Sequence, residues 1–77
     1  MTFAEQAISH FPWFIKDQCL YDTIRKLPGY IDCSLDYIDH LDGHWNIEFN
    51  IRFNDDSALE VKYYDDCLIK HEVYNEC

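Results

Sequence analysis

From Tyr30 onward, hydrophobic and polar residues alternate along the chain. The clearest run extends from Trp45 to Phe53, where every second residue is apolar, and similar alternation covers residues 31–37 and 59–64. This spacing is typical of half-buried antiparallel strands. Residues 67–74 form a fourth candidate strand, but the adjacent apolar residues Leu68 and Ile69 leave open which of them faces inward.

The first part of the chain follows a helical period instead. Thr2 and Glu5 have the spacing of a capping box, and apolar residues then recur on one helical face as far as Phe11. Pro12 ends this segment, and an amphipathic helix is predicted over Trp13–Lys26, with Trp13 on its apolar face. Pro28 and Gly29 stop that helix.

These elements predict one α+β domain over residues 1–77. An N-terminal helical segment, either one bent helix or two short helices, is expected to pack on one face of a three- or four-stranded antiparallel β-meander. A chain of 77 residues and 9.3 kDa is too small for an enclosed substrate cleft between two domains.

The first hairpin is expected to turn through residues 41–43, with Gly43 in the left-handed conformation. This register pairs Tyr37 with Ile47 and Leu35 with Phe49, which keeps the apolar side chains on one face. The outer face then has two notable cross-strand pairs, which are Asp36 with Glu48 and Asp32 with Arg52.

The second hairpin is expected to cross residues 54–58. In this register Phe53 pairs with Leu59, and Ile51 pairs with Val61. On the outer face, the same register makes Glu60 a neighbour of Arg52, and Lys62 a neighbour of Asn50.

Charge narrows the choice of partners. Fifteen acidic and six basic side chains give a net charge of −9. This excess excludes nucleic-acid binding through a basic surface and disfavours anionic membranes. The aspartate doublets at residues 55–56 and 65–66 suit turns, so each aspartate has an ordinary structural explanation. The like-charge pair Asp36–Glu48 has none, because like charges directly across two strands are unfavourable.

Candidate chemistry is sparse. Cys33 and Cys67 are predicted on the core face, where a thiolate is disfavoured, and the four cysteines, which also include Cys19 and Cys77, contain no C-x-x-C motif. Two glycines in all leave no phosphate-binding loop. The sequence therefore predicts a protein that is not an enzyme. It has no evident signal or membrane-spanning segment, so a cytoplasmic location with reduced thiols is expected.

The densest polar cluster covers residues 39–44 and includes His40 and His44. It lacks a recognised spacing of metal ligands, so neither a metal nor another cofactor is expected. His71 is expected to face the core as a structural histidine.

Three tyrosines lie close to acidic residues in the sequence. Tyr30, Tyr64 and Tyr74 have outward parity, and exposed tyrosine is common at protein interfaces. In size, acidity and α+β form, the chain resembles the small inhibitors that phages and mobile elements use against nucleases and CRISPR effectors, and also toxin-neutralising immunity proteins. This compositional resemblance covers no motif, and no single family matches these residues.

The leading hypothesis is an inhibitor that binds the basic nucleic-acid-binding surface of a partner protein, partly as a nucleic-acid mimic. One alternative is a homodimeric assembly module that associates through the outer sheet face or the edge of the fourth strand. Another is a His/Asp metal sensor. The residues expected to bind the partner are Asp32, Asp36, Glu48, Glu60, Tyr64, Asp55, Asp56, Asp65 and Asp66.

Overall fold

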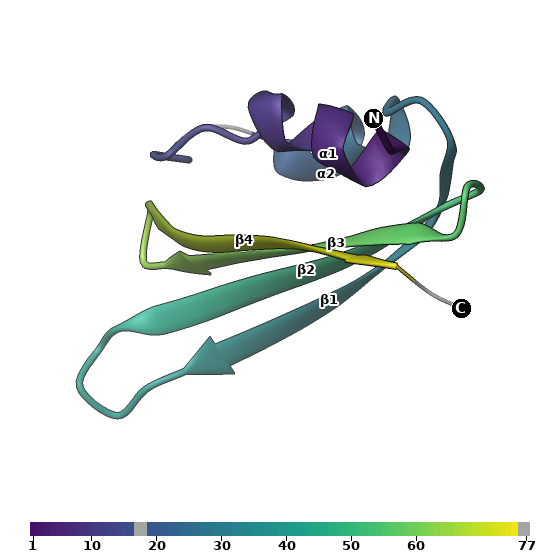
Figure 1. Cartoon of the computed structure of the whole chain (residues 1–77). Coiled ribbons are helices and arrows are strands. Elements are labelled where there is room, and N and C mark those ends of the chain that lie inside the picture. The colour runs from purple at the N-terminus through teal and green to yellow at the C-terminus, as the bar shows by residue number, and fades with distance from the viewer. Residues whose placement is uncertain (17–18, 76–77) are drawn as a thin grey trace.

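The computed structural model describes residues 1–16 and 19–75 (Figure 1). Two short α-helices and a 3₁₀ turn precede four strands. In chain order these elements are α1 (Phe3–Ala7), η1 (Ile8–His10), α2 (Leu20–Arg25), β1 (Tyr30–Asp39), β2 (Trp45–Phe53), β3 (Ser57–Tyr64) and β4 (Cys67–Asn75).

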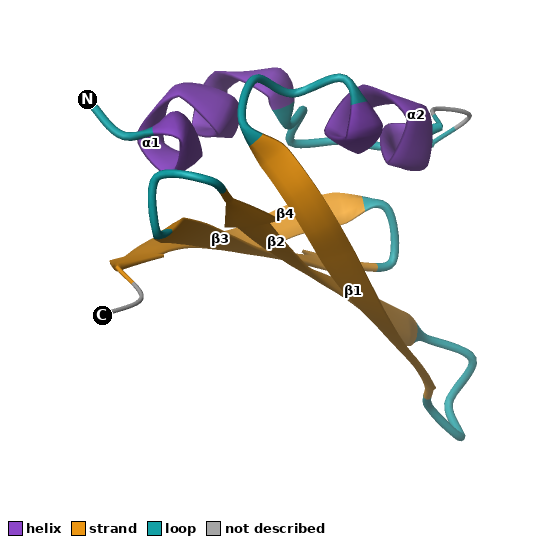
Figure 2. Ribbon diagram, turned by 90° about the vertical axis from the view of Figure 1, so that its right-hand side faces the viewer, coloured by secondary structure: helices purple, strands orange, loops and turns teal. Residues whose placement is uncertain are grey.

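The strands form one antiparallel sheet in the order β1-β2-β3-β4, and the helices lie together on one face of it (Figure 2). This layout confirms the predicted α+β fold, with four strands. The α1 helix packs on β2, β3 and β4, whereas α2 contacts β1. The molecule is elongated, at 39 × 24 × 17 Å.

The core lies between the helices and the inner face of the sheet. Every second side chain of the strands forms one side of this core, and the side chains on one face of each helix form the other side. The buried hydrophobic residues are Ala4, Ala7, Phe11, Ile15, Leu20, Ile24, Leu27, Phe49, Ile51, Phe53, Leu59, Val61 and Tyr63.

The start of α1 is held by the turn between β2 and β3. Thr2 and Glu5 form the predicted capping box, in which each side chain accepts a hydrogen bond from the other residue's backbone N–H at 3.1 Å. Phe3 N donates to Asp55 Oδ2 (2.9 Å), and Ala4 N donates to Ser57 Oγ (3.2 Å). A helix N-terminus leaves its first N–H groups without intrahelical acceptors, and here side chains supply the acceptors.

The prediction of a helix over Trp13–Lys26 is wrong for its first part. The backbone of residues 13–15 pairs with the β3–β4 turn: Leu68 N donates to Trp13 O (2.7 Å), and Ile15 N donates to Asp66 O (2.8 Å). These bonds to the sheet replace helical ones, so Trp13 is 72% exposed rather than buried. Within the described residues the second helix begins at Leu20. Of the two predicted alternatives, one bent helix or two short helices, the structure has two short helices.

The first hairpin has the predicted register. Tyr37 lies opposite Ile47, Leu35 opposite Phe49, and Asp36 opposite Glu48. Gly43 has φ 88°, which is the left-handed conformation expected of it.

The predicted register of the second hairpin is wrong by two residues. Ile51 lies opposite Leu59, and Arg52 lies opposite Ala58. The turn is tighter than expected because Asp56 takes a left-handed conformation (φ 66°), which closes a short loop without glycine. On the outer face, Glu60 therefore lies opposite Asn50, and Lys62 opposite Glu48, rather than in the predicted pairs.

Two further predictions are wrong because the strands contain β-bulges. The register shifts at Ile31, so Tyr30 lies opposite Phe53 and packs against the core instead of facing outward. A second shift at Ile69 places Cys67 opposite Tyr64, where its side chain is exposed rather than in the core. An extra residue reverses the face of every residue beyond it, which strict alternation cannot foresee. His71 does lie on the inner face, opposite Val61, but is exposed on the edge strand β4.

The β1–β2 hairpin extends beyond the helices (Figures 1 and 2). The 10 residues of β1 span about 33 Å. The 5 residues of α1 and 3 of η1 span only about 13 Å. We call residues 35–47 the distal hairpin, and its inner face is incompletely covered. Within the described residues, no helix is long and apolar enough to cross a membrane.

Candidate partner-binding surface

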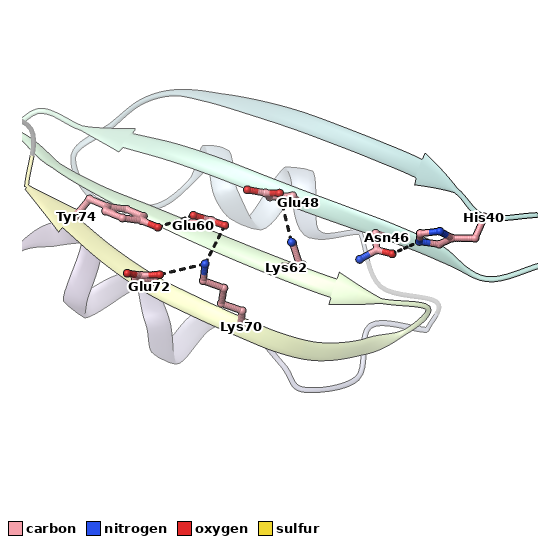
Figure 3. Close-up of polar contacts among 8 residues, drawn as sticks. All are labelled: His40, Asn46, Glu48, Glu60, Lys62, Lys70, Glu72 and Tyr74. Carbon is pink, nitrogen blue, oxygen red and sulfur yellow. Dashed lines mark hydrogen bonds and ion pairs between the residues drawn. The ribbon is translucent and has the colours of Figure 1, made fainter.

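On the outer sheet face, Glu60 is the centre of a network of polar contacts (Figure 3). Tyr74 donates to Glu60 Oε2 at 2.6 Å, and Lys70 Nζ lies 3.4 Å from Glu60 Oε1. Lys70 Nζ also lies 3.1 Å from Glu72 Oε2. The Glu60 side chain is only 13% exposed, so most of its charge is satisfied within the protein.

Glu48 belongs to the same network. Its Oε2 lies 3.8 Å from Lys62 Nζ, and its carboxyl group is a hydrogen-bond neighbour of Glu60. That contact raises the pKa of Glu48, because a proton on Glu48 can be donated to Glu60. The pKa of Glu60 is lowered, chiefly by the Tyr74 hydroxyl. Glu48 and Glu60 therefore offer a partner less charge than the sequence suggests.

Asp32 is paired as predicted, across the strands with Arg52. Arg52 Nε donates to Asp32 Oδ1 at 2.8 Å, and its NH2 group bonds the other carboxylate oxygen. These bonds lower the pKa of Asp32. The pair lies at the wall of a surface hollow of about 520 Å³, whose lining includes Ser34, Asn50 and Tyr74. Because Asp32 neutralises the guanidinium, the hollow carries little net charge.

Asp36 differs from these three acids. It is exposed and lies opposite Glu48, as predicted. Among the described residues, it forms no hydrogen bond or ion pair through its side chain. The unfavourable pair with Glu48 is thus relieved on one side only, where Lys62 approaches Glu48.

The aspartates of the β2–β3 turn have different roles. Asp55 accepts hydrogen bonds from Phe3 N (2.9 Å) and Ser57 N (3.1 Å), and its pKa is lowered mainly by the hydroxyl of Ser57. It is therefore a structural residue. Asp56 is exposed at the left-handed position of the turn.

The β3–β4 turn is likewise partly structural. Asp65 accepts from Trp45 N at 3.1 Å and lies 2.7 Å from His44 Nδ1, and this pairing raises the pKa of His44. The carbonyl oxygen of Asp66 accepts from Ile15 N, but its carboxylate is not part of that bond. Tyr64 lies beside them on the outer face, where its ring stacks on His44 with centroids 5.3 Å apart.

Fewer cations therefore contact the carboxylates at the distal end of the sheet than those at its centre, although Asp65 is paired with His44. We call the carboxylates there the acidic end. No lysine or arginine occurs in the segments 36–46 and 63–69 that carry them. The acidic end consists of Asp36, Asp39, Asp42, Asp65 and Asp66.

Exposed apolar side chains lie in the same region, and sequence reasoning missed them. Leu35 is 47% exposed and Tyr37 is 54% exposed, although both occupy the inner face predicted to be core. Tyr37 stacks on Trp45 with centroids 6.0 Å apart, and its hydroxyl donates to Asp39 (3.0 Å). The sequence did not indicate this exposure, because the helix predicted over Trp13–Lys26 is longer than the observed α2 and the strand predicted over residues 31–37 is shorter than the observed β1.

The polar loop at residues 39–44 does not gather metal ligands. His40 bonds Asn46, whereas His44 is directed to Asp65. Over residues 1–16 and 19–75, no group of three or more His, Cys, Asp or Glu side chains could hold a metal ion. Cys19, Cys33 and Cys67 are free thiols, and Cys77 lies outside the described residues.

Comparison with protein-family models, with curated proteins and with solved structures finds no match to this chain.

Proposed function

We propose that this protein binds a protein with a cationic nucleic-acid-binding surface and inhibits it by occupying that surface. Its carboxylates partly imitate the charge of phosphates. The observation that supports this proposal is the acidic end, whose carboxylates come from chain segments that contain no lysine or arginine; they belong to Asp36, Asp39, Asp42, Asp65 and Asp66. The cytoplasmic location expected from the sequence belongs to the same proposal.

Electrostatics favours such a partner. A net charge of −9 on so small a domain attracts cationic surfaces and accelerates association with them. Screening extends over about 10 Å at 0.1 M salt, so exposed carboxylates at the acidic end lose much of this attraction as salt is added. Asp32, Glu48 and Glu60 contribute less, because internal cations and hydroxyl groups already contact them.

The apolar surroundings favour a protein partner over a simple cation. Leu41 is fully exposed in the loop, and Tyr37 and Leu35, on the inner face of the distal hairpin, are about half exposed. Tyrosine is enriched at protein interfaces and among the residues that contribute most to binding. An interface at this end would bury them.

Affinity capture followed by competition tests the proposal. The protein is immobilised at low salt, captured proteins from its native cell are identified, and each is assayed for nucleic-acid binding with and without the protein. We expect a nucleic-acid-binding protein whose nucleic acid is displaced, and weaker displacement at high salt. The variant Asp39→Asn/Asp42→Asn keeps side-chain shape and should displace less.

A matched control carries the same change of charge elsewhere. Asp22→Asn/Glu72→Gln neutralises two exposed acidic residues away from the acidic end and should displace as well as the wild type. The proposal fails if no captured protein binds nucleic acid, or if the two double variants behave alike.

A homodimeric assembly module is the second candidate. It is favoured by the β4 edge, where Ile69 is exposed at a bulge. Sedimentation velocity decides this, since a dimer through β4 should dissociate in Ile69→Lys.

A further inference from the structure

We propose that the open edge of β1 in the distal hairpin binds an extended segment of the partner as an added strand, and that cationic and apolar residues alternate in this segment. The inference rests on the proposed function, because it specifies which part of a cationic partner is bound. Strand addition is an established mode of peptide recognition, in which backbone hydrogen bonds supply affinity and side-chain contacts supply specificity.

The backbone of this edge is available. β1 is the first strand of the sheet and has only β2 as a neighbour. His40 N donates to His44 O at 2.8 Å, so these two residues form a hydrogen-bonded pair of the β1–β2 ladder. Because hydrogen-bonded and non-hydrogen-bonded pairs alternate, the even-numbered residues of β1 bond to β2. The odd-numbered residues 33–39 therefore direct their N–H and C=O groups to the open side.

The β2–β3 ladder agrees with this assignment. Asp65 N donates to Trp45 O at 2.8 Å, so odd-numbered residues of β2 bond to β3. Their partners on β1, which include Leu35 and Tyr37, have no ladder bonds to β2. Among the described residues, no other loop or strand pairs with this edge.

The inner face beside the edge suits apolar side chains. Leu35 and Tyr37 are about half exposed there, and Ile47 lies half-buried next to them. The helices stop short of this region (Figure 2). Every second residue of an added strand would lie over this apolar surface.

The outer face and the tip suit cationic side chains. Asp36 projects outward with no ion pair among the described residues, and it lies opposite Glu48. A lysine or arginine on an added strand next to Asp36 would relieve this like-charge pair. Asp39 supplies a second carboxylate at the end of β1, on the inner face next to Tyr37.

Charge also disfavours a second copy of this chain at the same edge. β1 carries Asp32, Asp36 and Asp39 and has no lysine or arginine. Pairing two β1 strands would bring these carboxylates together from both copies, whereas a cationic strand would neutralise them. The opposite edge strand, β4, suits a cationic segment less well, because it carries Lys70 and the carboxylate of Glu72 is already paired with that lysine.

A peptide of alternating lysine and valine, long enough to pair with residues 33–39, is the direct probe. The matched peptide has the same sequence but is methylated on the backbone nitrogens that would face β1. Charge and apolar content are thus retained while the hydrogen-bond donors are lost. Fluorescence anisotropy should show saturable binding of the first peptide and affinity weaker by about tenfold or more for the second.

Variants of the protein test the same edge. Leu35→Pro removes an N–H that faces the open side, a position at which an edge strand tolerates proline. Leu35→Ala removes the side chain and keeps the N–H. We expect Leu35→Pro to weaken peptide binding more than Leu35→Ala, and Asp36→Asn to reduce the dependence of binding on salt. Circular dichroism checks that each variant is folded. If Leu35→Pro is unfolded, the backbone amides of the wild type whose NMR chemical shifts change on adding the peptide locate its binding site instead.

Several results would overturn the inference. They are absence of peptide binding, equal binding of the two peptides, amide shifts confined to β4, and a homodimer that Leu35→Pro dissociates. The competition assay for the proposed function remains independent of these outcomes. Conversely, peptide binding at β1 without displacement of nucleic acid from any captured protein would retain the strand site and reject the inhibitory role.

Discussion

Ser57 provides a quantitative test of how the helices are attached to the sheet. Its side chain is among the most deeply buried, with 1% of the residue exposed, and its Oγ accepts a hydrogen bond from Ala4 N at 3.2 Å. Ala4 itself is 0% exposed. In Ser57→Ala the Ala4 N–H loses its acceptor and has no access to water in its place.

The expected cost follows from this geometry. A buried donor left without an acceptor costs about 1–3 kcal/mol. The total stability expected of a 77-residue domain is about 4–12 kcal/mol, so the loss is a substantial fraction. Each kcal/mol lowers the melting temperature of a domain of this size by about 4–8 °C. Ser57→Ala should therefore melt roughly 5–20 °C below the wild type.

Urea and thermal unfolding followed by circular dichroism measure the effect. Ser9→Ala is the control: Ser9 is exposed, and its Oγ donates to Gln6 O at 3.1 Å. It should change the free energy of unfolding by less than about 0.5 kcal/mol. If Ser57→Ala is as mild as Ser9→Ala, the helix is not anchored to the β2–β3 turn in the way described.

Three further predictions concern separate parts of the molecule. Gly29→Ala should destabilise the protein more than Gly43→Ala in urea unfolding. Both glycines have positive φ, which costs a substituted residue about 1–2 kcal/mol of strain, but only at Gly29 would the new Cβ overlap a side chain, the ring of Phe3. Asp65 raises the pKa of His44 in the folded protein, so this pair stabilises the fold below about pH 6.5. The stabilisation is lost as the pH rises through the folded-state pKa of His44. The free energy of unfolding of His44→Gln should therefore lack this pH dependence. Hydrogen bonding to a carboxylate raises the pKa of Tyr74 to about 12, so Tyr74→Phe should remove one late-ionising phenol from an absorbance titration at alkaline pH.

The strand pattern was predictable because a single buried face imposes a period of two on the sequence. This accounts for the correct register of the first hairpin, where Gly43 also marked the turn. The second hairpin lacked such a marker. Asp56 adopts the left-handed conformation that glycine normally supplies, and the predicted loop was consequently too long.

The candidate surface was predicted less well than the fold. Sequence spacing identified Asp36 opposite Glu48 and Asp32 opposite Arg52. It did not reveal that Asp55 caps α1 or that Asp65 holds His44, because both contacts join segments far apart in the chain. Parity likewise treated the inner face of β1 as core.

The sequence by itself determined the helical and strand periods, the capping box at Thr2, the alternation that defines two sheet faces, and the net charge of −9. These are local or additive properties, so no knowledge of distant contacts is needed to derive them. Only the tertiary structure decided which carboxylates are satisfied internally and which stay free, where the bulges at Ile31 and Ile69 reverse the faces, and how far the helices cover the sheet. Those outcomes depend on competition among segments for the same hydrogen bonds and the same buried area, and that competition is resolved only when the whole chain packs.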